Sequence, residues 1–273
     1  MKPAPCLDED ARTLKRTESA APPAQPPAES GTREVPDQVD AATAPALRLS
    51  VIIPLAPGET DWQELLRQLG ALPAQSEVIL VHAEQEAVQQ PPAWPESLRL
   101  RAIASTPGRA RQQNVGAEAA RGRWLWFLHA DSRMQRSTLS ALCAFLDTEA
   151  DAMGYFDLVF AADGPRLAKL NAWGANLRSR WLRLPFGDQG LLLPATRFAE
   201  LGRFDEQARC GEDHLLVWAA HQAGLPVCGL GASLQTSARK YRRHGWLGTT
   251  LRHWRLTLAQ AWPAWRRMRR NSR

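Results

Sequence analysis

The chain has 273 residues, with 34 Lys and Arg side chains against 28 Asp and Glu, and 44% of its residues are hydrophobic. This composition is that of a globular protein, so a wholly disordered chain is excluded, and the length suits one large α/β domain or two small ones. The sequence contains no run of about 18 apolar residues, so no membrane-spanning helix is predicted. From the polar N-terminus we expect no secretory signal. The four scattered cysteines form no CxxC pair, which favours a reduced, cytoplasmic protein.

The charge divides the chain into three segments. Residues 1–46 hold 8 acidic and 5 basic side chains and 8 of the 20 prolines, and are predicted to be a disordered Pro/Ala-rich arm. Residues 239–273 hold 11 Lys and Arg side chains and no acidic one. We therefore expect a folded domain over residues 47–238, followed by a basic tail that seeks an anionic surface.

Short β-branched runs alternate with segments of helical spacing through the first half of the folded part. Strands are predicted at residues 49–54, 77–82, 98–103 and 124–128, and helices at residues 61–69, 107–121 and 137–146. This alternation is typical of right-handed βαβ units with a largely parallel sheet. Such sheets bind ligands at the carboxyl ends of their strands, so the loops after residues 53, 81, 103 and 128 should carry the chemistry.

The second half is more mixed, with predicted strands at residues 155–160, 190–193 and 227–230 and helices at residues 167–182 and 213–223. Two acidic segments stand out. Asp131 follows the buried strand that ends at residue 128, where a carboxylate could hold a divalent cation or only cap a turn. Glu212 and Asp213 begin a helix, where the helix dipole favours them even without a role as a general base.

Two further segments carry polar side chains in unusual places. Arg109 and Arg111 lie in the first turn of a predicted helix, where the dipole disfavours cations, so an anion such as a nucleotide phosphate is expected nearby. A solvated basic face is the alternative. The turn Gly187-Asp188-Gln189-Gly190 would expose Asp188 and Gln189, which could hydrogen-bond sugar hydroxyls or simply form a loop.

The order of these segments is more specific than any one of them. A strand ending in Pro54 is followed by GRARQxNxGA at residues 108–117, HAD at 129–131, GDQG at 187–190, ED at 212–213 and TSAR at 236–239. Over residues 49–246 this series resembles the family 2 glycosyltransferases, and is similar in particular to the radical-SAM/selenodomain-associated transferase subgroup. The resemblance implies a GT-A (Rossmann-like) fold, with a mixed, mostly parallel sheet flanked by helices.

The resemblance also implies an inverting transfer from a nucleotide-diphospho-sugar donor to an acceptor hydroxyl, assisted by Mg²⁺ or Mn²⁺. Within the family's pattern, Asp131 would bind the metal and Asp213 would be the base, with Glu212 as its neighbour on the acceptor side. The remaining matches are to the donor and acceptor: Glu59, Arg109, Asn114 and Gly116 toward the nucleotide, and Asp188 and Gln189 in the sugar and acceptor pocket. Donor sugar and acceptor are not implied, although a lipid-linked molecule is one acceptor class.

Two departures from the family's pattern support a second hypothesis. His82 stands where an Asp usually reads the nucleobase, and the Asn that usually precedes Glu59 is missing. A catalytically inactive GT-A module that serves as a scaffold or sugar-nucleotide sensor is therefore kept as the alternative.

The basic tail carries apolar residues at helical spacing: Leu247, Leu251, Trp254, Leu258, Ala261 and Trp265. A Trp-rich stripe beside an Arg cluster predicts an amphipathic helix at the inner face of the cell membrane, or one docked on the domain. Specific nucleic-acid binding is not expected, because no recognition motif accompanies the charge.

Overall fold

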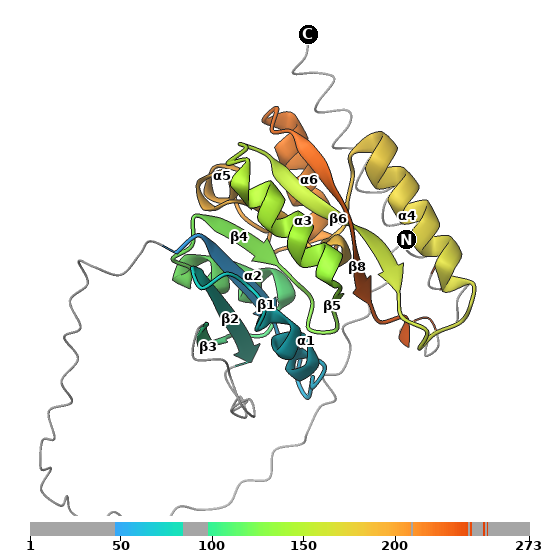
Figure 1. Ribbon diagram of the computed structural model, residues 1–273, viewed down its shortest axis with the longest axis horizontal. Helices are drawn as coiled ribbons and strands as arrows, with labels where there is room; N and C mark the ends of the chain where they lie inside the picture. The colour runs from blue at the N-terminus through green and yellow to red at the C-terminus, as the bar shows by residue number, and fades with distance from the viewer. Residues whose placement is uncertain are drawn as a thin grey trace, which may run out of the picture. The chain divides into compact units, whose positions relative to one another are not determined.

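The computed structural model describes residues 47–83, 98–208 and 210–239, together with residues 241, 248 and 250 (Figure 1). All of them belong to one compact unit, Ala46–Arg273. The arm predicted at residues 1–46 and nearly all of the tail predicted at residues 239–273 lie outside the described residues. None of the described helices combines the length and the apolarity that crossing a bilayer requires.

Eight strands of the described residues form one sheet in the order β3-β2-β1-β4-β7-β6-β8-β5. Their bounds are β1 Leu49–Pro54, β2 Ser76–Ala83, β3 Arg99–Ser105, β4 Trp124–Phe127, β5 Arg133–Met134, β6 Met153–Phe160, β7 Leu192–Pro194 and β8 Val227–Thr236. β1 to β4 are mutually parallel, as are β6 and β8, whereas β7 runs antiparallel to both of its neighbours and β5 runs antiparallel to β8. The expected mixed, mostly parallel α/β sheet is therefore confirmed.

Helices cover both faces of this sheet, as Figure 1 shows. Their bounds are α1 Trp62–Leu69, α2 Arg109–Ala119, α3 Arg136–Asp147, α4 Ala168–Leu182, α5 Ala195–Glu200 and α6 Glu212–Gln222, with a short 3₁₀ turn, η1, at Gly187–Gln189. One core cluster joins the sheet to α1 and α3, and a second joins its other face to α2, α5 and α6. A third, smaller cluster packs α4 against β6.

Gly116 explains how α2 lies so close to the sheet. A Cβ at this position would be 2.5 Å from Cγ2 of Ile52 and 3.0 Å from Cγ2 of Val81, which are on β1 and β2. Glycine therefore permits a backbone approach that any larger residue would block. This approach fixes the start of α2 and Arg109 relative to the carboxyl ends of β1 and β2.

The observed elements differ from the sequence predictions mainly after β4. β5, α5 and η1 were not predicted, because two to six residues are too few to show a periodic pattern. The strand predicted at residues 227–230 extends to Thr236, since β8 pairs with β6 over both halves of its length. The pairing has an irregularity between Tyr155 and Asp157 of β6, opposite the glycine-containing middle of β8.

Candidate functional site

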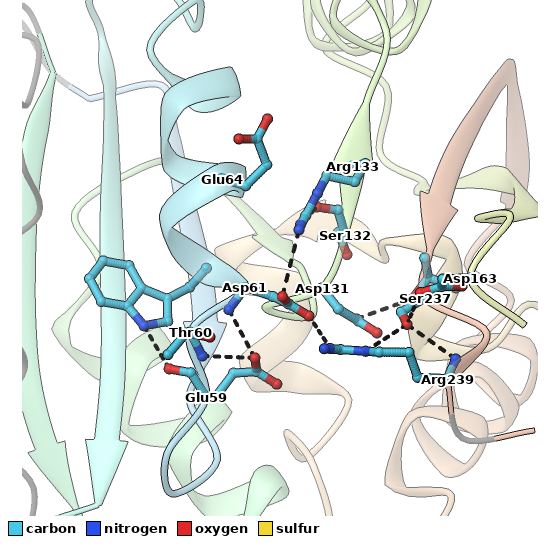
Figure 2. Close-up of polar contacts among 12 residues, drawn as sticks. Glu59, Thr60, Asp61, Glu64, Asp131, Ser132, Arg133, Asp163, Ser237 and Arg239 are labelled. Carbon is cyan, nitrogen blue, oxygen red and sulfur yellow. Dashed lines mark hydrogen bonds and ion pairs between the residues drawn. The ribbon is translucent and has the colours of Figure 1, made fainter. Parts of the chain in front are cut away.

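The carboxyl ends of β1, β4 and β8 bring three charged loops together. Asp61 follows β1, Asp131 follows β4, and Arg239 follows β8 (Figure 2). The Arg239 guanidinium donates to Asp61, which is also 3.9 Å from the Arg133 guanidinium. The hydroxyl of Thr236, the last residue of β8, donates to Oδ1 of Asp131 at 3.1 Å. We call Asp61, Asp131, Arg133 and Arg239, with the residues that hold them, the Arg239 cluster.

Asp163 completes the Arg239 cluster by holding the end of β8. Its carboxylate accepts hydrogen bonds from the Ser237 hydroxyl at 2.5 Å and the Ala238 backbone N–H at 2.8 Å. The Ser237 hydroxyl oxygen in turn accepts from Nε of Arg239 at 3.0 Å. Burial raises the pKa of Asp163, but these hydrogen bonds and the nearby Arg239 charge outweigh it, so that the net shift is downward. The backbone that carries Arg239 is thus fixed by an ionised carboxylate.

Glu59 shapes the loop after β1. Its Oε1 accepts hydrogen bonds from the backbone N–H groups of Thr60 and Asp61, each at 2.9 Å, and its carbonyl accepts from the Trp62 indole at 2.9 Å. These bonds present Asp61 to Arg239 (Figure 2). The sequence pattern indicates Glu59 as a site residue but not Asp61, which it predicts only as the start of a helix.

Arg109 lies at the centre of a second group of charged residues. It forms an ion pair with Glu212 through Nε, its Nη2 is 4.0 Å from Oδ2 of Asp213, and its Nη1 is 3.5 Å from Nε2 of His129. We call these four residues the Arg109 cluster. His129 is two residues from Asp131, so the chain after β4 connects this cluster to the Arg239 cluster. The anion expected near Arg109 thus includes carboxylates of the protein itself.

Asp213 and Glu212, the two acids of the Arg109 cluster, are both enclosed: their side chains are 13% and 5% exposed. Its Oδ2 accepts from the Gly187 N–H at 2.5 Å and its Oδ1 from the His214 N–H at 2.8 Å. Burial raises the pKa of this carboxyl, but the Arg109 charge and these two N–H groups outweigh it, so the net shift is downward. Asp213 is therefore ionised at neutral pH.

Glycine is required at position 187 for this contact. A Cβ there would be 2.6 Å from Oδ2 of Asp213, so a side chain would push the carboxylate away from the N–H that binds it. The turn η1 thus positions Asp213. Gln189, also in η1, is fully buried, and its amide donates to the Phe156 carbonyl at 2.9 Å while its Oε1 accepts from Ser179 at 2.7 Å. Gln189 holds the turn from within rather than presenting its side chain to a ligand.

Two residues beside Asp213 were missed by sequence reasoning. Arg178 of α4 places its guanidinium 3.6 Å from the centre of the Phe186 ring, and lies near Asp188 and Asp213. Burial lowers the pKa of Arg178, while the two carboxylates oppose the shift. The His214 ring accepts the Trp218 indole N–H at Nε2 at 2.6 Å, so its neutral form carries the proton on Nδ1. Burial lowers the pKa of His214 to about 4.

Arg111 and Asn114 face the loop that precedes α6. Arg111 pairs with Glu206 at 2.8 Å and donates to the Thr106 hydroxyl at 3.0 Å. The Asn114 amide donates to the Phe204 carbonyl at 2.9 Å and accepts from the Phe204 N–H at 3.1 Å. The structure therefore uses both side chains to tie α2 to this loop, and brings neither into the Arg109 cluster or the Arg239 cluster.

Comparison with known proteins shows a shared fold. No protein-family model and no curated protein matches the sequence. Among solved structures, S. aureus TarS 1–349 in complex with UDP-GlcNAc matches with a TM-score of 0.55 and 19% identity, over 70% of this chain and 58% of that one. The complex of the same fragment with UDP matches with a TM-score of 0.56 and 19% identity, over 70% and 60% of the two chains.

The chain thus spans about three-fifths of these TarS fragments, and 37% of a longer TarS structure that it also matches. At this identity the likeness establishes the fold. The GT-A (Rossmann-like) fold class expected from the sequence is confirmed, and the likeness does not extend to the narrower subgroup.

The residues present allow one mode of binding for a divalent cation. Within the described residues, no group of three or more His, Cys, Asp or Glu side chains could by itself hold a metal ion. Asp61 is paired with two guanidinium groups, and Asp131 accepts a hydrogen bond from the Thr236 hydroxyl. Mg²⁺ commonly binds one or two carboxylates and takes its other ligands from phosphates and water. Asp131 fits such a cation if a bound diphosphate completes the site.

Proposed function

We propose that the chain is an inverting glycosyltransferase that moves a sugar from a nucleotide-diphospho-sugar to an acceptor hydroxyl. The observation that carries the proposal is Asp213, an ionised carboxylate at the start of α6 held by Gly187 and Arg109. It is linked through Arg109 and His129 to the strand end that carries Asp131. The likeness in fold to TarS structures with UDP-GlcNAc and UDP supports a nucleotide-sugar donor.

In this mechanism Asp213 acts on the acceptor hydroxyl, and the Arg239 cluster acts on the bond between the sugar and the diphosphate. The acceptor hydroxyl loses its proton to Asp213 as its oxygen bonds to the anomeric carbon from the face opposite the diphosphate. The bond between the anomeric carbon and the diphosphate oxygen breaks, and the nucleoside diphosphate leaves with the electron pair. Attack on the opposite face inverts the configuration of the sugar.

The Arg239 cluster would stabilise the leaving group. Arg133 and Arg239, which both pair with Asp61, provide positive charge in the cluster that contains Asp131, and guanidinium groups suit phosphate oxygens. Asp131 would hold a Mg²⁺ or Mn²⁺ ion, which when bound neutralises diphosphate charge. Arg109 and Glu212 act as positioning residues, since their ion pair fixes the guanidinium beside Asp213.

The proposal includes a place of action. The tail at residues 239–273 carries eleven cationic side chains and no acid, which supports peripheral binding at the cytoplasmic face of the membrane. A lipid-linked acceptor would be available at that surface. This part of the proposal rests on the sequence of the tail.

Calorimetric titration of the full chain with UDP, UDP-GlcNAc and other nucleotide sugars in the presence of Mn²⁺ tests donor binding. Binding accompanied by slow donor hydrolysis supports the enzyme, because water can replace the missing acceptor. No binding of any donor would favour the catalytically inactive scaffold instead.

Asp213→Asn tests the base. It is expected to lower donor hydrolysis about 10²- to 10⁴-fold, the usual contribution of a general base, while UDP binding survives. Asp151→Asn is the matched control, because Asp151 is an exposed acid paired with Arg197 outside both clusters. Hydrolysis at the wild-type rate in the Asp213→Asn variant would contradict the assignment.

A further inference from the structure

The large hydrophobic side chains that are exposed in the described part of the chain gather on one helix. Apart from Val159 on β6, all of them lie on α4 or directly before it: Leu167, Leu170, Trp173, Leu177, Trp181 and Leu182. Trp173 is 67% exposed and Trp181 is 80% exposed. Leu170, Trp173, Leu177 and Trp181 follow one another at helical spacing, so they form a single stripe, which we call the α4 face.

The α4 face is not the side by which the helix is held. Ala168 and Ala172 pack with Leu158 and Phe160 of β6, and Asn176 exchanges two hydrogen bonds with the Leu158 backbone. α4 is thus anchored to the domain by small and polar residues, while its largest apolar side chains point elsewhere. Contiguous exposed apolar surface of this kind marks an interaction site.

Basic side chains surround the α4 face. Residues 164–187 contain four arginines and one lysine and no acidic residue; one of the arginines, Arg178, is buried beside Asp213 and does not belong to this surface. Arg166 and Lys169 are exposed at the beginning of the helix, and Arg180 and Arg183 lie near its end, where Arg180 pairs with Asp157 of β6. The surface that meets this face should therefore be apolar in part and negatively charged.

The chain returns to this helix at residue 250. The side-chain amide of Asn171, in the first turn of α4, donates to the Thr250 hydroxyl at 2.9 Å and to the Tyr241 hydroxyl at 3.3 Å. The 23 residues that follow Thr250 contain seven arginines, three tryptophans and no acid. The described residues Tyr241 and Thr250 of the basic tail thus contact α4 at Asn171.

We propose that the α4 face, with its surrounding cations, binds the surface of a membrane that contains anionic lipids. Trp side chains favour the boundary between headgroups and acyl chains, and Lys and Arg near that boundary are attracted by anionic headgroups. A second copy of the chain, or its own tail, would bring like charges together. The positive charges of the α4 face and of the tail instead complement the negative charge of the lipid headgroups.

The helix that bears the α4 face also reaches the candidate site. Arg178 of α4 lies near Asp213, and the chain leaving α4 leads directly to Gly187, whose N–H binds the Asp213 carboxylate. A lipid-borne acceptor would therefore reach the base from the bound membrane. That last step rests on the proposed glycosyl transfer, whereas lipid binding by the α4 face does not.

Flotation of the full chain with vesicles tests the proposal. The wild-type protein is expected to float with vesicles of phosphatidylcholine and phosphatidylglycerol, and much less with phosphatidylcholine alone. The double variant Trp173→Gln/Trp181→Gln should lower the partition coefficient about tenfold or more, because it removes the two largest interfacial side chains. Its thermal midpoint without lipid should stay within about 2 °C of the wild-type value, since both residues are exposed.

A charge variant has a matched control. Arg166→Gln/Lys169→Gln should lower partition into anionic vesicles about 25-fold, because each of the two cations near such a surface contributes about 1 kcal/mol, or about fivefold. Arg67→Gln/Arg123→Gln removes two exposed cations from α1 and from the start of β4, and should partition as the wild type does.

Three results would overturn the proposal. The first is that the wild type does not float, or that the Trp variant floats equally well. The second is a lower thermal midpoint of the Trp variant with unchanged flotation, which would indicate that the tail covers the α4 face. The third is a wild-type dimer that the Trp substitutions dissociate. Titration of the same preparations with UDP separates these outcomes from a failure of donor binding.

Discussion

His214 should make the fold sensitive to acid. The ring is 1% exposed and burial lowers its pKa to about 4, compared with about 6.5 in an unfolded chain. Between these values the unfolded chain binds a proton that the folded protein does not, so the free energy of unfolding falls as the pH falls. For this one group the loss between pH 7 and pH 4.5 amounts to about 2 kcal/mol.

The variant His214→Gln should remove this dependence while keeping an acceptor for the Trp218 indole. Urea unfolding followed by Trp fluorescence at the two pH values measures the effect. The stability difference between pH 7 and pH 4.5 should be smaller in the variant by about 2 kcal/mol, whatever its absolute stability. His221→Gln, a partly exposed histidine in the last turn of the same helix, is the control for losing a ring. Equal pH dependence in the wild type and the His214→Gln variant would refute the reasoning.

Three other substitutions test the site and its support. We expect Mn²⁺ to raise the UDP affinity of the wild type about 10- to 100-fold, and Asp131→Asn should remove this gain. Titration with UDP in the presence of Mn²⁺ and in the presence of a chelator measures it. Gly187→Ala should lower donor hydrolysis by about 10²-fold with UDP affinity retained, because the new Cβ displaces the Asp213 carboxylate. Gly116→Ala should cost about 1–3 kcal/mol in urea unfolding, since α2 must move away from Ile52; unchanged stability would show that α2 adapts freely.

The first half of the fold could be predicted from the sequence because it is made of repeated local patterns. β1, β2 and β4 are short apolar runs, and α1 has buried residues at helical spacing. β5 and the second half of β8 could not be predicted in this way. They exist because residues about a hundred positions apart pair with each other, as Arg133 does with Gln235.

The candidate site divides in the same manner. Asp131 and Asp213 could be found because each stands at the end or start of a regular element. Asp61, Arg178 and His214 could not, because their importance comes from partners far away in the sequence or from burial. Asn114 and Gln189 were predicted to bind substrate because they lie in a conspicuous motif. In the structure, each holds a loop in place through hydrogen bonds to the backbone.

The pairing of β8 has a consequence for how the protein is made. Arg239 binds an aspartate 178 residues earlier in the chain, and the hydroxyl that binds Asp131 belongs to Thr236. On a ribosome, β1 to β4 can form a sheet long before these partners have been synthesised. The Arg239 cluster is completed only when the last strand enters the sheet. A nascent chain would therefore complete the Arg239 cluster only after β8 and Arg239 have left the ribosome.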